Sequence, residues 1–92
     1  EYFGPVVAIF NGLRKVTLYP NPVTENHINL DFNFNPVENA RVIILNSFGV
    51  SIASYSGIAI NNRIGLPSLS PGVYFLKFQS MDLSEIRRFI VR

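Results

Sequence analysis

The chain has 92 residues and a formal net charge of +2, and its composition is 48% hydrophobic and only 15% charged. A disordered segment needs low hydrophobicity and high charge, so this composition excludes a disordered chain. The length allows one domain with a thin core. The small net charge does not indicate a nucleic-acid surface, and the lack of cysteine excludes disulfides without fixing the redox compartment.

Residues 1–14 differ from the remainder of the chain because they show no match to the pattern that follows. Gly4, Pro5, Asn11 and Gly12 mark breaks, so we expect this segment to be a linker or the tail of a preceding domain. Its apolar part, VVAIF, is too short for a membrane helix. It could pair with an exposed strand edge in its own molecule or in a neighbouring one, which would give a strand-exchanged homodimer of the isolated domain.

Apolar residues at every second position dominate the chain after residue 15. Ile28, Leu30 and Phe32 alternate with Asn29 and Asp31, which predicts a strand with one buried and one wet face. Turn signals recur about every ten residues, and this spacing is typical of an all-β sandwich. The expected strands are 16–19, 27–34, 40–46, 50–56, 60–66, 72–79 and 85–91.

Proline and glycine mark the connections between these strands. Within YPNP (19–22) the prolines lack the N–H that a ladder needs and keep the preceding residues extended. We expect this segment to end the first strand and to run, unpaired, along a sheet edge or across to the second sheet. NSFG (46–49) indicates a hairpin. SPGV (70–73) predicts a type II turn with Gly72 at positive φ.

Four motifs in order resemble the type A C-terminal sorting domain of the type IX, or Por, secretion system. They are KVTLYPNPV (15–23), VIILNSFGV (42–50), LPSLSPGVYFLKF (66–78) and RRFIVR (87–92). The positions that carry the resemblance are Tyr19, Pro20, Asn21, Pro22, Gly49, Pro71, Gly72 and Tyr74. The hairpin departs from the family pattern of aspartate, glycine and a basic residue, since Asn46 and Val50 take the outer places.

The resemblance implies that residues 15–92 form a seven-stranded antiparallel immunoglobulin-like β-sandwich. It implies a signal, not an enzyme, that is read by the outer-membrane secretion machinery and directs a fused upstream cargo domain across the periplasm and outer membrane of a Gram-negative bacterium. Such a domain is typically cut off after export by a sortase-like surface protease. The cargo is then attached to the cell surface or released into the medium.

The residues themselves give little sign of catalysis, metal or cofactor binding. His27 is the only histidine and falls on the wet face of its strand, so we expect a solvent-facing polar residue and not a catalytic one. Zinc would require cysteine or clustered histidine, calcium would require closely spaced acidic residues, and no phosphate-binding glycine loop is present. The aromatic pair Tyr74 and Phe75 beside Lys77 is expected to pack in a strand, not to stack on nucleic-acid bases.

The basic end of the chain leaves two interpretations open. Arg87, Arg88 and Arg92, with Ile90, could be a solvated face or a docking strip for an acidic partner surface, while Phe89 and Val91 are expected in the core. Two function classes remain as well, a sorting signal and an immunoglobulin-like binding module for carbohydrate or a cell-surface protein; a hydrolase is remote. Most aromatic residues fit core positions, which disfavours the carbohydrate binder.

Overall fold

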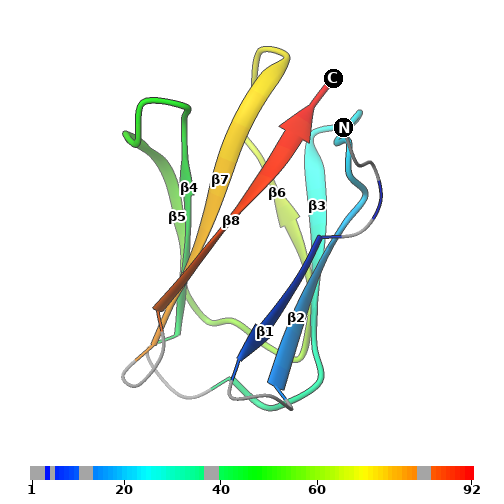
Figure 1. Cartoon of the computed structure of the whole chain (residues 1–92), viewed down its shortest axis with the longest axis vertical. Helices are drawn as coiled ribbons and strands as arrows, with labels where there is room; N and C mark the ends of the chain where they lie inside the picture. The colour runs from blue at the N-terminus through cyan, green and yellow to red at the C-terminus, as the bar shows by residue number, and fades with distance from the viewer. Residues whose placement is uncertain (1–3, 5, 11–13, 37–39, 81–83) are drawn as a thin grey trace.

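The computed structural model describes residues 4, 6–10, 14–36, 40–80 and 84–92, and this part of the chain contains eight strands and no helix (Figure 1). The strands are β1 (Val6–Phe10), β2 (Arg14–Tyr19), β3 (His27–Phe32), β4 (Arg41–Leu45), β5 (Ser51–Tyr55), β6 (Asn61–Gly65), β7 (Gly72–Gln79) and β8 (Ser84–Val91).

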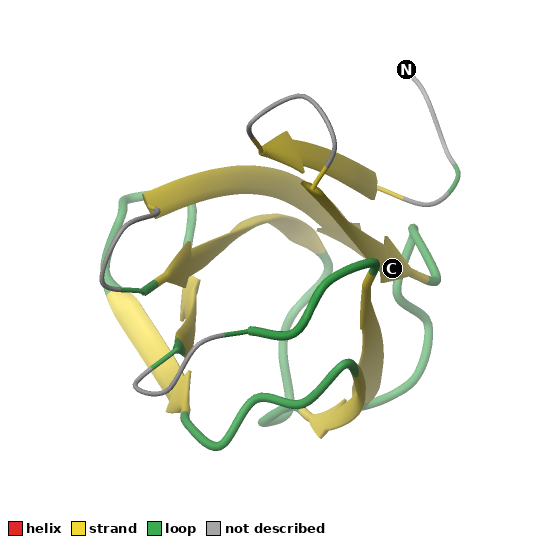
Figure 2. Ribbon diagram, turned by 90° about the horizontal axis from the view of Figure 1, so that it is seen from below, coloured by secondary structure: helices red, strands yellow, loops and turns green. Residues whose placement is uncertain are grey.

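Two four-stranded sheets form the architecture. The first has the strand order β1-β2-β3-β6 and the second has the order β5-β4-β7-β8. All neighbouring strands within the two sheets are antiparallel, and Figure 2 shows the strands arranged around a common interior. The all-β, immunoglobulin-like sandwich expected from the sequence is confirmed.

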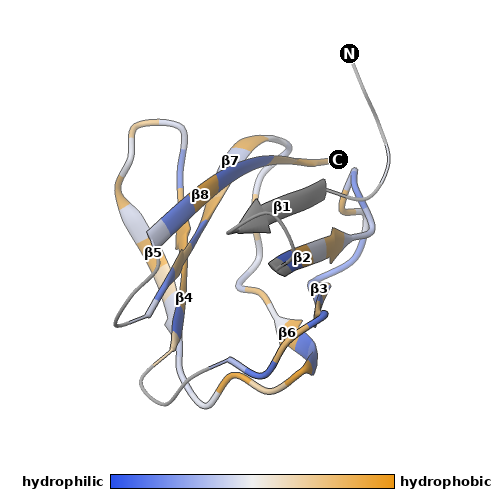
Figure 3. Cartoon of the chain, turned by 60° about the horizontal axis from the view of Figure 1, so that its bottom comes forward, coloured by the Kyte–Doolittle hydropathy of each residue, from blue (hydrophilic) through white to orange (hydrophobic). Residues whose placement is uncertain are grey.

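The core lies between the sheets and follows directly from the period-two pattern. In β3, Ile28, Leu30 and Phe32 are buried, whereas Asn29 and Asp31 point to the other face and are half-buried. Figure 3 shows hydrophilic and hydrophobic residues mixed along strands β4, β7 and β8 as well. The buried hydrophobic residues are Val16, Leu18, Val23, Ile28, Leu30, Phe32, Ala40, Val42, Ile44, Ile64, Leu76, Phe78, Phe89 and Val91. They come from both sheets, so neither sheet has a separate core.

All seven expected strands are present, with ends that differ by at most two residues, and β1 adds an eighth. β1 pairs with the edge of β2, from Val6 opposite Leu18 to Phe10 opposite Arg14. The apolar segment therefore pairs with a strand edge of its own molecule, one of the two arrangements that the sequence allowed. The assignment of residues 1–14 to a linker or preceding domain stays a prediction.

Candidate recognition site on the last strand

The YPNP segment carries the chain from the first sheet to the last strand of the second. The peptide bonds Tyr19–Pro20 and Asn21–Pro22 are both cis. Beyond them, the Val23 N–H donates to the Ile90 carbonyl at 2.7 Å, and the Arg92 N–H donates to the Val23 carbonyl at 2.8 Å. Of the two expected routes, the crossing to the second sheet is the one observed. Pairing with β8 begins at Val23, directly after the segment, because Val23 has the N–H that the prolines lack.

Asn21 fixes this crossing through its side chain. Its Oδ1 accepts a hydrogen bond from the Ile90 N–H at 3.0 Å, its backbone carbonyl accepts one from the Gly4 N–H at 2.9 Å, and the residue is only 9% exposed. The Asn21 amide oxygen thus accepts the bond that the carbonyl of a neighbouring strand would accept in a sheet. The residues on both sides of Asn21 are prolines, which have no N–H to donate. Together with Val23, it closes the last part of the β8 edge, which would otherwise be open for pairing with another chain.

The side chains of β8 divide between the core and the outside. Phe89 and Val91 are 1% and 7% exposed, so their expected core position is confirmed. Arg88 is exposed and Ile90 half-buried on the opposite face, and the exposed Arg92 follows in the same phase.

Arg87 is separated from this group by the alternation of the strand. It lies on the same side as Phe89, where its Nη1 is 2.6 Å from Glu85 Oε2 and also donates to the Ile86 carbonyl at 2.8 Å. The structure therefore brings together three of the four candidate recognition residues, and Arg87 lies on the other face with a carboxylate partner.

The SPGV motif starts β7 but does not form the expected type II turn. Gly72 has a φ of 157°, whereas that turn needs a φ of about 80° at this position. Gly72 is instead the first residue of β7 and pairs with Val91. The positive φ itself was predicted correctly, and an added Cβ would meet nothing within 4 Å. The preference for glycine is therefore conformational and not steric.

Tyr74 anchors the loop that precedes β7. Its hydroxyl donates to the Ser70 carbonyl at 2.7 Å, and its ring stacks on Phe89 with centroids 6.1 Å apart. A tyrosine that bonds back to the backbone a few residues upstream also occurs in immunoglobulin-like sandwiches, where it fixes a corner between strands. In this chain it ties the 66–71 loop to the core side of β8.

Residues 17–92 match the sequence model of the secretion system C-terminal sorting domain, the family of type IX secretion signals. The chain belongs to this family. Nothing among curated proteins or solved structures matches the chain. Membership implies export across the outer membrane of a Gram-negative bacterium, contact with the secretion machinery and a cargo upstream, and the family is not an enzyme family.

The β4–β5 hairpin of this sorting domain shows how asparagine replaces the aspartate of the family pattern. Asn46 Oδ1 accepts from the Phe48 N–H at 2.9 Å and from the Val50 N–H at 3.0 Å. Gly49 has a φ of 82°, a conformation that glycine adopts readily. The amide oxygen makes the bonds that a carboxylate would make here, so the turn keeps its shape without the charge.

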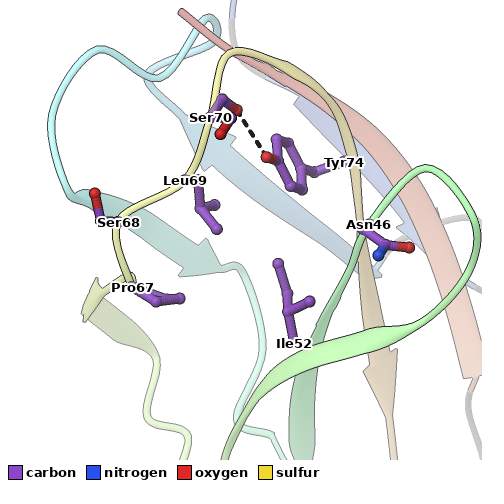
Figure 4. Close-up of a pocket in the computed structure, with 7 residues that line it drawn as sticks. All are labelled: Asn46, Ile52, Pro67, Ser68, Leu69, Ser70 and Tyr74. Carbon is purple, nitrogen blue, oxygen red and sulfur yellow. Dashed lines mark hydrogen bonds between the residues drawn. The ribbon is translucent and has the colours of Figure 1, made fainter.

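An open depression of about 350 Å³ lies beside this hairpin (Figure 4). It is lined by Asn46, Ile52, Pro67, Ser68, Leu69, Ser70 and Tyr74. None of these side chains is charged, and the Tyr74 hydroxyl is directed at Ser70 in the figure. The lining of the depression therefore consists of apolar and uncharged polar side chains.

The polar face of the first sheet carries the single histidine of the chain, His27. Its Nδ1 lies 3.5 Å from Arg63 Nη2, while Asp31 Oδ2 accepts from the Tyr19 hydroxyl at 2.8 Å. This bond to the Asp31 carboxylate raises the pKa of Tyr19. Among the described residues, no group of three or more metal-ligating side chains is present, and no helix could cross a membrane.

Two contacts of the sorting domain have no clear signal in the sequence. Asn21 reaches Ile90 across 69 residues, and the Tyr55 hydroxyl donates to the Gly65 carbonyl at 2.8 Å. The second contact joins β5 to β6, which belong to different sheets, and burial raises the pKa of Tyr55. A lone polar residue between two prolines was the one hint of the first contact.

Proposed function

We propose that residues 15–92 are the export signal of a larger cargo protein and that residues 1–14 connect the signal to that cargo. The family match over residues 17–92 carries this proposal. After passage through the periplasm and the outer membrane, a sortase-like surface protease removes the domain, and the cargo is attached to the cell surface or released.

The secretion machinery reads the outward side of β8 in this proposal. Arg88 and Arg92 are exposed there, with Ile90 half-buried between them, while Phe89 and Val91 hold the strand in the core. Arg87 belongs to the proposed set with a smaller contribution, because Glu85 already neutralises it. Exposed charges contribute little to stability, so recognition can change without loss of the fold.

The test uses a reporter fused before the complete chain in a bacterium with a type IX system. We expect the fusion to reach the cell surface, and deletion of residues 15–92 to leave it inside the cell. Arg88→Ala with Arg92→Ala should lower the surface reporter while the thermal midpoint of the purified chain stays the same. Export that survives the deletion would contradict the signal function and favour the binding-module alternative. Normal export of the double variant would contradict recognition through β8.

Cleavage is tested separately on the exported fusion. Mass spectrometry of the surface or released reporter should find a product that has lost residues 15–92. An exported reporter that keeps the intact domain would contradict removal by a surface protease without affecting the export function.

A further inference from the structure

The outer faces of the two sheets have different chemistry. On the first sheet, the paired outward positions include Thr17 opposite Asp31 and Asn29 opposite Arg63, so that face is polar and carries both signs of charge. On the second sheet, two cross-strand rows run over β4, β7 and β8. The rows are Ile43–Lys77–Ile86 and Leu45–Phe75–Arg88, and we call these six residues the second-sheet face.

The second-sheet face combines apolar side chains with two cations, Lys77 and Arg88. Phe75 and Lys77 are half-buried, and Ile86 is 48% exposed. Lys77 and Arg88 occupy diagonal positions on neighbouring strands, close enough for side chains to interact. Within the described part of the chain neither forms an ion pair, and the acidic residue of these strands, Glu85, lies in the opposite phase with Arg87.

Two features of this face suit a partner surface. Lys77 and Arg88 place two like charges on diagonal positions of neighbouring strands, and the apolar side chains beside them, with Ile86 48% exposed, are of the kind that interaction sites on soluble proteins present. From this we propose that the second-sheet face is the docking surface for a protein whose own surface has an apolar centre and carboxylates placed opposite Lys77 and Arg88. The inference rests on the proposed function, and it extends the recognised surface from β8 to β7 and β4.

Two other occupants fit less well. A second copy related by two-fold symmetry would present the same patch to itself, which brings Lys77 and Arg88 close to their own symmetry mates without any acid. A lipid surface favours apolar side chains that project from the protein. On this sheet Phe75 and Leu45 are half-buried, and the strongly projecting aromatic residue, the 88% exposed Phe48, belongs to the β4–β5 hairpin outside the face.

The experiment reverses charge on one face at a time in the reporter fusion of the complete chain. Lys77→Glu with Arg88→Glu is compared with Lys15→Glu with Arg63→Glu on the first sheet, which changes the net charge equally. We expect the first pair to reduce the surface reporter roughly tenfold or more, because like charges facing each other across an interface are strongly unfavourable. The second pair should export like the unchanged chain, and thermal midpoints should show that both variants fold.

Each outcome decides one question. Normal export of the Lys77/Arg88 variant would overturn the docking face and leave the export function standing. Equal losses in both variants would overturn it too, because net charge would then be the cause. If the reversed variant does not fold, Lys77→Gln with Arg88→Gln takes its place, with the same expectation of reduced export.

The partner class is tested with the purified chain and vesicles of phosphatidylethanolamine and phosphatidylglycerol. We expect no co-sedimentation. Binding that depends on Lys77 and Arg88 would assign the face to a lipid surface and overturn the protein partner. Absence of export by the unchanged fusion would instead contradict the proposed function, and the docking face with it.

Discussion

Replacement of Asn21 by alanine tests the crossing between the sheets. The change removes the acceptor of the 3.0 Å bond from the Ile90 N–H. An unsatisfied buried donor costs about 1–3 kcal/mol. Because Ile90 is half-buried on an edge strand, water can replace part of the bond. We therefore expect the free energy of unfolding to fall by about 1–2 kcal/mol. For a domain of this size, each kcal/mol shifts the thermal midpoint by about 4–8 °C, so the midpoint should fall by roughly 4–16 °C.

The chain offers a matched control in Asn35→Ala. Asn35 also precedes a proline, Pro36, but is exposed, so its replacement should change the stability by less than about 0.5 kcal/mol. Calorimetry measures both midpoints, and amide hydrogen exchange should show faster exchange at Ile90 in the Asn21 variant alone. Equal midpoints for the two variants, with Ile90 exchange unchanged, would refute the role given to the Asn21 side chain.

Three further predictions concern the core, a glycine and a tyrosine. Phe89→Ser should cost at least about 3 kcal/mol in urea unfolding, because the ring is 1% exposed; a loss under 1 kcal/mol would contradict its core position. Gly72→Val should destabilise by roughly 1 kcal/mol or more, since its φ is 157°, and more than Ser70→Ala; equal urea midpoints would contradict this. Burial raises the pKa of Tyr55 in the folded chain. The stability that goes with this shift is therefore complete below the unfolded pKa of about 10 and is lost as the pH rises through the folded pKa. Tyr55→Phe should weaken this loss of stability at alkaline pH, as measured by unfolding at a series of pH values.

The strands could be predicted from the sequence because their signals are local. Alternation in β3 places Ile28 and Leu30 inward whatever the remainder of the chain does, and proline, glycine and asparagine mark the ends. β1 could be foreseen only as an apolar segment, since its place depends on the edge that β2 leaves open. Gly72 was assigned to the wrong turn because pairing with Val91, far along the chain, sets its conformation.

The candidate site was less accessible to sequence reasoning. Alternation located Phe89 inside and Arg88 outside, but it gave no reason to connect Asn21 with Ile90. That bond joins the segment after β2 to β8, and the Tyr55–Gly65 bond joins strands of different sheets. Contacts of this kind have no periodic signature in the sequence. The diagonal placement of Lys77 and Arg88 on the second sheet likewise emerges only when the register of β7 and β8 is known.

The bridge between Val23 and Val91 has a consequence for the order of synthesis and folding. The first crossing of the sandwich cannot be fastened until residues 90–92 have been made, because they supply both the donors and the acceptor that hold residues 21–23. A chain that stops before residue 90 lacks the end of the β8 edge and the anchor of its own early segment at once. Translation products that break off within β8 would therefore present an unfastened sandwich, and a receptor that accepts only the closed one would reject them.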